Sequence, residues 1–137
     1  MKYLSDYTEQ AQTLAFERHG AFFAFGQKQF NEKRREGVKY VNMGAGLLCP
    51  EENVAQLIEE LDAGYKDAVR LDVSENGAEK IIEREYFNHE TQLTGDKTAM
   101  LDSLVLHIEQ FPELFTDEAI KLVSRKCHAL AVENDWF

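Results

Sequence analysis

The clearest pattern along the chain is the helical spacing of apolar residues after Pro50. One stripe follows the i, i+3, i+4, i+7 rule and consists of Val54, Leu57, Ile58 and Leu61. This spacing places apolar side chains on one face of an amphipathic helix. Pro50 suits the first helical position, because its missing N–H has no intrahelical partner there in any case. We expect the helix to end near Asn76-Gly77, and a pause at Gly64 is left open.

The second half of the chain predicts three more helices. They cover about residues 78–92, about residues 97–111 and a last segment that Thr116 caps. The buried face expected for the second of them consists of Met100, Leu101, Leu104, Ile108 and Phe111. The buried face expected for the last consists of Ile120, Val123, Cys127 and Leu130.

Short helices and short strands alternate before Pro50. A helix is predicted over residues 5–19 and a polar helix over residues 27–36, and each is followed by a glycine that suits a helix C-terminus. Aromatic and β-branched residues predict strands over residues 21–25 and 38–43. The expected fold class is therefore α+β, a mostly helical single globular domain over residues 1–137 with a small two- or three-stranded sheet near the N-terminus.

Charge and composition change this picture in two ways. The formal net charge of −10 disfavours general attraction to nucleic acid or to anionic membranes. The longest apolar run, Ala21–Phe25, is far too short to span a bilayer. Two cysteines are too few for a disulfide framework, and the N-terminus shows no signal peptide, so a cytoplasmic location is expected. A homo-oligomer is left open.

Residues 20–48 differ from the rest of the chain in charge, because they carry a net charge of +3 and five of the eight glycines. Their cations lie close in sequence to aromatic residues. A solvated helix face is the favoured interpretation of such a mixture. If it has a partner, an acidic protein surface is as good a candidate as a nucleic-acid strand. The residues predicted to contact a partner are Lys28, Phe30, Lys33, Arg34 and Arg35.

A second candidate is the turn Gly44-Ala45-Gly46, which lies between a predicted strand and a predicted helix. Phosphate-binding loops occupy such a position. The third glycine of that fingerprint is replaced by Cys49, and Glu51 and Glu52 place negative charge where phosphate would lie. A tight strand-to-helix turn is therefore favoured, and no cofactor is predicted.

Histidines give a third set of candidates. The segment His89-Glu90-Thr91-Gln92-Leu93 lacks the second histidine of the HExxH zinc motif. His89 lies four residues after Glu85, which predicts a local pair between the two side chains. His89 and Glu90 stay secondary candidates, in a small metal-binding protein or hydrolase that uses residues 88–90 with Cys49 or His107. A satisfied core histidine is favoured for His107. Because no catalytic or metal signature is complete, a non-enzymatic role is favoured.

A fourth candidate is the acidic row Glu75, Glu79 and Glu83, which recurs every four residues. On one continuous helix these carboxylates would form a line about 6 Å apart, which Asp72 and Glu90 could extend. Such a line could imitate a DNA backbone and inhibit a DNA-binding protein. An ordinary solvated helix surface is the favoured interpretation.

Three segments carry a resemblance to other proteins. They are residues 22–33, residues 39–53 and residues 84–90, including KYVNMGAGLLCPEEN and REYFNHE. Together they resemble small uncharacterised proteins encoded by bacteriophages and bacterial mobile elements. The resemblance implies an accessory or regulatory protein that binds host proteins, and it carries no functional residues with it. A non-enzymatic protein-binding factor is thus the leading hypothesis.

Overall fold

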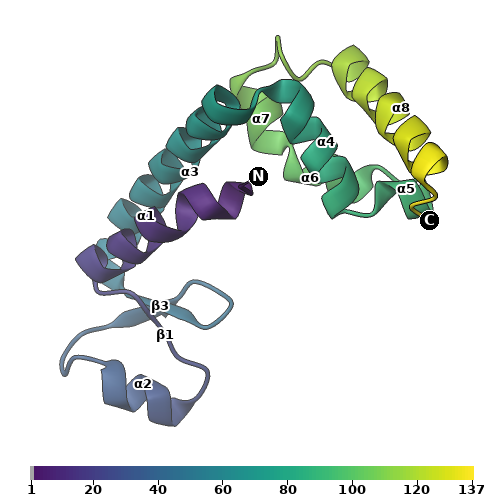
Figure 1. The fold of residues 1–137 in the computed structure, drawn as a ribbon. Coiled ribbons are helices and arrows are strands. Elements are labelled where there is room, and N and C mark those ends of the chain that lie inside the picture. Colours follow the sequence, from purple (N-terminus) through teal and green to yellow (C-terminus); the bar gives the residue numbers. More distant parts are fainter. Residues whose placement is uncertain (1) are drawn as a thin grey trace. The chain divides into compact units, whose positions relative to one another are not determined.

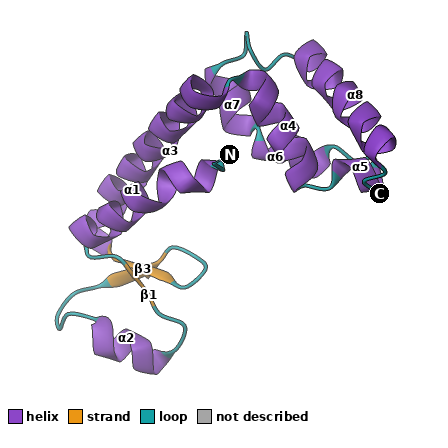
Figure 2. Cartoon of the chain, in the orientation of Figure 1, coloured by secondary structure: helices purple, strands orange, loops and turns teal. Residues whose placement is uncertain are grey.

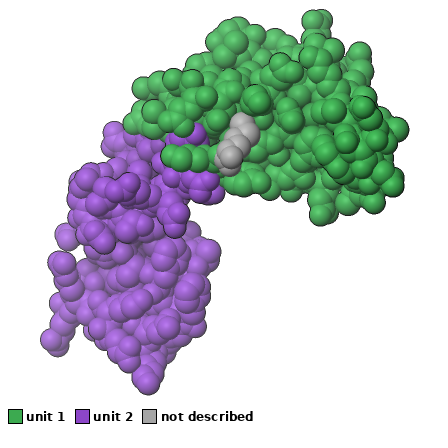
Figure 3. Space-filling model, in the orientation of Figure 1, with its two compact units in different colours: residues 1–4, 66–137 green, residues 5–65 purple. Residues whose placement is uncertain are grey.

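The computed structural model describes residues 2–137. Helices dominate the chain, and a small sheet lies near the N-terminus (Figures 1 and 2), which confirms the predicted α+β class. Contacts divide the described chain into two compact units, coloured separately in Figure 3. We call residues 5–65 the sheet unit, and residues 2–4 with residues 66–137 the helical unit. The single domain expected from the sequence stays a prediction.

The sheet unit contains a three-stranded antiparallel sheet with strand order β1-β3-β2. Its elements are α1 (Leu4–His19), β1 (Phe22–Phe23), α2 (Gln27–Lys33), β2 (Tyr40–Asn42), β3 (Leu47–Pro50), the 3-10 helix η1 (Glu51–Asn53) and the first part of α3 (Val54–Asn76). On one face of the sheet, Cys49 is buried with Ala15 of α1 and Leu57 of α3. Helix α2 covers the other face, as Figure 1 shows.

The third strand corrects the expected role of Pro50. Instead of beginning a helix, Pro50 is the last residue of β3 and pairs with Tyr40 of β2. The glycine turn therefore joins two antiparallel strands, and it does not lead from a strand into a helix. Gly44, Ala45 and Gly46 all have positive φ there, a conformation that glycine adopts without strain at two of the three positions. Helix α2 is also shorter than predicted, because it ends at Lys33.

The helical unit is built mainly on the packing of α4 against α8. Its elements after α3 are α4 (Ala78–Asn88), α5 (Thr91–Thr94), α6 (Thr98–Ser103), α7 (Val105–Gln110) and α8 (Asp117–Asn134). Its buried core consists of Ile81, Ile82, Tyr86, Met100, Leu104, Phe115, Ile120, Val123 and Cys127. The predicted cap of α8 is confirmed, because the Thr116 hydroxyl accepts a hydrogen bond from the Ala119 N–H at 3.1 Å.

Two predicted helices are interrupted. The helix expected over about 78–92 ends at Asn88, because Glu90 adopts left-handed backbone with φ +52°, and α5 follows it. The helix expected over about 97–111 is divided between α6 and α7 at Leu104. Helix α3 continues through Gly64 and ends at Asn76, next to Gly77 with φ +77°. Three residues expected on buried faces are exposed, namely Ile58, Leu101 and Leu130.

Candidate functional site

An aromatic cluster fixes α2 on the sheet. The ring of Phe30 lies 6.4 Å from that of Phe22 and 5.7 Å from that of Tyr40, measured between ring centroids. Phe22 and Tyr40 also meet edge to face at 5.4 Å. No residue of α2 is fully buried, so these three rings supply much of its attachment. The predicted contact residue Phe30 is thus half-buried and acts as the anchor of α2.

The four predicted cationic contact residues are exposed on α2 and directly after it. The Lys33 ammonium donates to the Phe23 carbonyl oxygen at 2.9 Å, and the Arg34 guanidinium lies 5.7 Å from the centre of the Phe30 ring. The backbone N–H of Arg35 donates to the Tyr40 hydroxyl at 2.9 Å. Lys28, Phe30, Lys33, Arg34 and Arg35 are called the α2 surface from here on.

None of the α2-surface cations forms an ion pair with a carboxylate in the described chain. Arg35 also lines a polar cavity of about 100 Å³. Arg18 and His19 border the same cavity, and both side chains pair with Glu60. Among the described residues that line this cavity, the cation without a carboxylate partner is therefore Arg35.

Two exposed aromatic residues lie beside the α2 surface. Phe25 is 77% exposed, and its backbone N–H donates to the Gln29 side chain of α2 at 2.8 Å. Its ring stacks on Phe23 at 6.2 Å and covers Gly46 so closely that an added Cβ there would lie 2.6 Å from the ring. Gly46 also has φ +82°, so backbone strain and lack of space both favour glycine.

The secondary candidates His89 and Glu90 belong to the helical unit, whereas the α2 surface belongs to the sheet unit. His89 pairs with Glu85 at 3.2 Å between Nε2 and Oε2, which confirms the predicted local pair. Glu90 is exposed in its left-handed turn. Within residues 2–137, no group of three or more His, Cys, Asp and Glu side chains could hold a metal ion.

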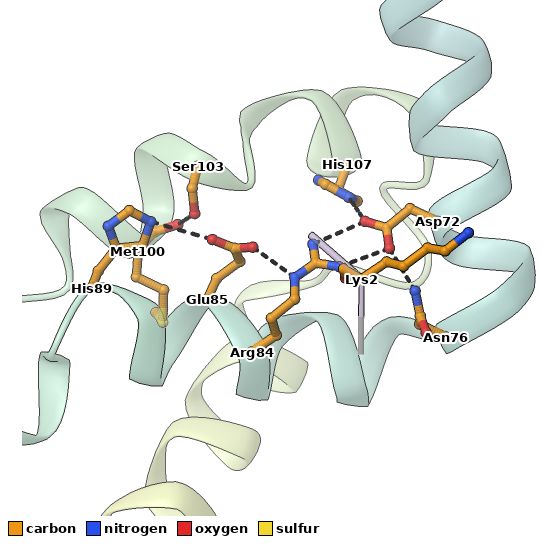
Figure 4. Close-up of polar contacts among 9 residues, drawn as sticks. All are labelled: Lys2, Asp72, Asn76, Arg84, Glu85, His89, Met100, Ser103 and His107. Atoms are coloured by element: carbon orange, nitrogen blue, oxygen red, sulfur yellow. Dashed lines mark hydrogen bonds and ion pairs between the residues drawn. The ribbon is translucent and has the colours of Figure 1, made fainter. Parts of the chain in front are cut away.

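Glu85 is also part of a buried polar cluster that the sequence did not predict (Figure 4). The Arg84 guanidinium binds both carboxylate oxygens of Asp72 at 2.8 and 2.9 Å. Its Nε donates to Glu85 at 2.8 Å, and the Asn76 amide donates to Asp72 at 2.8 Å. His107 Nε2 lies 2.8 Å from the second Asp72 oxygen. The cluster joins α3, α4 and α7 within the helical unit.

Hydrogen bonding controls the charge of this cluster. Burial alone would raise the pKa of Asp72, but hydrogen bonds from His107, Arg84 and Asn76 outweigh it and hold that pKa well below its usual range. Burial would likewise lower the pKa of Arg84, but its bonds to Asp72 and Glu85 raise it. Asp72 and Arg84 therefore form a buried ion pair in which each charge compensates the other. His107 is completely buried and its Nε2 is bonded to Asp72, as the favoured interpretation of a core histidine requires. Its buried Nδ1 has no hydrogen-bond partner among the described residues, so the histidine is only partly satisfied.

A signal for this cluster exists in the sequence. Asp72 has the helical spacing of buried residues, since it lies three residues after the buried Val69. Arg84 and Glu85 have the same spacing, since they lie three residues after the buried Ile81 and Ile82. A charged residue on an apolar helix stripe needs a buried partner. The pairing itself joins distant segments and has no local signature.

The acidic row is divided by the break at Gly77. Glu75 lies in α3, whereas Glu79 and Glu83 lie in α4, so the three do not share one helix. Asp72 does not extend the row, because it is buried. Glu79 pairs with Lys126 of α8 at 3.4 Å.

Neither cysteine suits nucleophilic chemistry. Burial raises the pKa of the Cys49 thiol. Burial, with the nearby charges of Glu83 and Glu79, raises the pKa of Cys127 to about 11. A thiol that stays protonated near neutral pH is a poor nucleophile. Cys49 packs in the core of the sheet unit, and Cys127 packs in the core of the helical unit.

Among residues 2–137, no helix combines the length and the apolar character needed to cross a membrane.

Comparisons with known proteins place the chain in a family. Searches of curated proteins and of solved structures found no match. The model of the family of unknown function DUF7659 matches residues 4–129, which is most of the chain. The chain therefore belongs to the DUF7659 family.

Proposed function

We propose that this protein is a non-enzymatic binding protein whose α2 surface docks an acidic segment of a partner protein. The observation that carries the proposal is the group of exposed cations without carboxylate partners on a chain of net charge −10. Unpaired surface cations are available to an incoming carboxylate, and complementary charge accelerates association and fixes its orientation.

The attachment of α2 supports the same role. Phe30 holds the helix to Phe22 and Tyr40, and Lys33 and Arg35 each make one hydrogen bond to the sheet segments. The backbone that carries the cations is therefore ordered before a partner arrives. Such preorganisation reduces the conformational entropy that binding would otherwise cost.

The surroundings favour a protein partner over nucleic acid. Phe23 and Phe25 offer exposed rings next to the cations, and aromatic residues with arginine are the usual anchors of protein interfaces. A phage or mobile-element origin and a cytoplasmic location stay predictions, which rest on the sequence alone.

Affinity capture with a matched pair of variants tests the proposal. The surface variant changes Lys28, Arg34 and Arg35 to glutamine, and the control variant changes the exposed Lys80, Lys121 and Lys126 to glutamine. Both remove three positive charges. In extracts of the source organism, the wild type and the control should retain the same protein, and the surface variant should lose it. Retention by the wild type and both variants, or loss by both triple variants, would contradict the α2 surface as the docking site.

A further inference from the structure

The helical unit contains a second feature that the α2 surface does not explain. A pocket of about 320 Å³ lies among α4, α5 and α8 and the turn between α5 and α6. The residues that form its polar wall are Tyr86, Thr91, Lys97, Ser124, Arg125 and His128. None of the residues that line it is acidic. This is unusual for residues 66–137, which contain fifteen Asp and Glu residues and eight Lys and Arg residues.

The basic side chains at this pocket have no acidic partner. Neither Lys97 nor Arg125 forms an ion pair or a side-chain hydrogen bond within the described residues. His128 forms no hydrogen bond or ion pair within the described residues, and its ring lies 6.2 Å from that of Phe137 between centroids. Elsewhere in the same unit, Arg70, Arg84 and Lys126 each pair with a carboxylate. The pocket thus gathers unpaired basic groups from two separate segments.

Two hydroxyl groups deep in the wall also lack partners. Thr91 is 1% exposed, and its Oγ1 has no hydrogen-bond partner among the described residues. Tyr86 is 3% exposed, and no hydrogen bond of its hydroxyl occurs within residues 2–137. Burial raises the pKa of Tyr86, so the phenol keeps its proton and can donate it. Ser124 does not contribute a donor, because its hydroxyl already donates to the Ile120 carbonyl oxygen at 2.7 Å.

We infer that this pocket binds a phosphate monoester. Lys97 and Arg125 supply positive charge, and an arginine fork matches the geometry of phosphate oxygens. His128 can donate a ring N–H in either protonation state, and the hydroxyls of Tyr86 and Thr91 can donate from the wall. A phosphate group has enough acceptor oxygens to use all these donors. A carboxylate has fewer acceptor positions and a smaller charge, so it fits the same set less well.

The size of the pocket indicates an organic phosphate. A water molecule occupies about 30 Å³ in the liquid, so the volume of about 320 Å³ corresponds to about ten waters. That is more than a phosphate group fills. Tyr86 and Ala129 also line the pocket, and they suit an apolar or aromatic substituent.

Titration of the whole chain with simple probes tests this inference. Phenyl phosphate, inorganic phosphate and benzoate are each titrated to about 10 mM while backbone amide NMR signals are followed. We expect saturable binding in the order phenyl phosphate, inorganic phosphate, benzoate, with shifts grouped at Thr91, Ser124 and His128. Changing Lys97 and Arg125 together to glutamine should weaken phenyl phosphate binding at least about tenfold. The reason is that each substitution removes one charge-assisted hydrogen bond to the phosphate group.

The matched control changes the exposed Lys80 and Lys121 to glutamine, which removes the same charge outside the pocket and outside the α2 surface. It should bind phenyl phosphate as the wild type does. The inference is overturned if no probe binds saturably, if benzoate binds as well as phenyl phosphate, or if both double variants weaken binding equally. The result is independent of the α2 surface, because changing Lys97 and Arg125 leaves that surface intact.

Discussion

Arg84 and Arg34 carry the same guanidinium group in opposite settings. Arg84 has a side chain only 4% exposed and binds two carboxylates. Arg34 is exposed, its guanidinium lies over the Phe30 ring, and it forms no ion pair within residues 2–137. When one member of a buried ion pair is removed, the remaining charge stays buried without compensation. When an exposed charge is removed, any nearby charge is still solvated by water. The comparison separates charges that stabilise the fold from charges that are free to bind a partner.

The largest effect is expected from Arg84→Met. This change leaves Asp72 and Glu85 buried without their cation, so the free energy of unfolding should fall by about 3–5 kcal/mol. Urea denaturation measures it. The control Arg34→Met should change the same quantity by less than about 1 kcal/mol. Similar losses for both variants would contradict the division between the two kinds of charge.

The second-largest effect is expected at low pH, where the Asp72 cluster should lose its contribution to the free energy of unfolding. The pKa of Asp72 is lower in the folded chain than in the unfolded chain. Its contribution to stability is therefore complete above the unfolded pKa of about 3.9, and it is lost as the pH falls toward the folded pKa. We expect unfolding free energies measured from pH 6 down to acid to decline less steeply in Asp72→Asn than in the wild type. The exposed control Asp67→Asn should keep the wild-type slope.

A smaller effect is expected in the sheet unit from Gly46→Ala. The alanine would have to keep φ +82°, and its Cβ would press against the Phe25 ring. We expect a loss of about 1–3 kcal/mol in the free energy of unfolding. Gly26→Ala is the control, since its φ of −174° is ordinary extended backbone and its Cβ would meet open space. Equal stability of the two variants would show that the hairpin does not need the glycine.

The smallest effect is expected where a single cap is removed. Thr116→Ala deletes the hydroxyl that accepts from the Ala119 N–H at the start of α8. The free energy of unfolding should fall by about 1 kcal/mol. Thr98→Ala is a weaker matched change, because the backbone N–H of Thr98 still donates to Asp96 after its hydroxyl is lost. A loss for Thr98→Ala as large as that for Thr116→Ala would contradict the cap.

Local patterns in the sequence predicted the long helices, the cap at Thr116 and the break at Gly77. They did not predict β3, because Pro50 suits a helix start and its pairing with Tyr40 depends on a hairpin closed by three residues of positive φ. Nor did they show that Leu104 divides the helix expected over about 97–111. Both features depend on contacts outside the segment concerned.

The candidate site was predictable to a different extent. The residues of the α2 surface lie within eight positions of one another, so charge and aromatic content in one segment were sufficient to find them. Asp72, Arg84 and His107 come from three helices, and only their meeting in space gives them a role. The pocket basic residues Lys97 and Arg125 were missed for the same reason.

The central claim is that the α2-surface cations serve binding and not folding. The most direct measurement combines urea unfolding with affinity capture for the variant in which Lys28, Arg34 and Arg35 are changed to glutamine. We expect this variant to lose the captured partner. We expect its free energy of unfolding to stay within about 1 kcal/mol of the wild type, because exposed charges contribute little to stability. If the variant still captures the same partner, these cations do not form the docking site. If it loses the partner only because it unfolds, they serve folding and not binding.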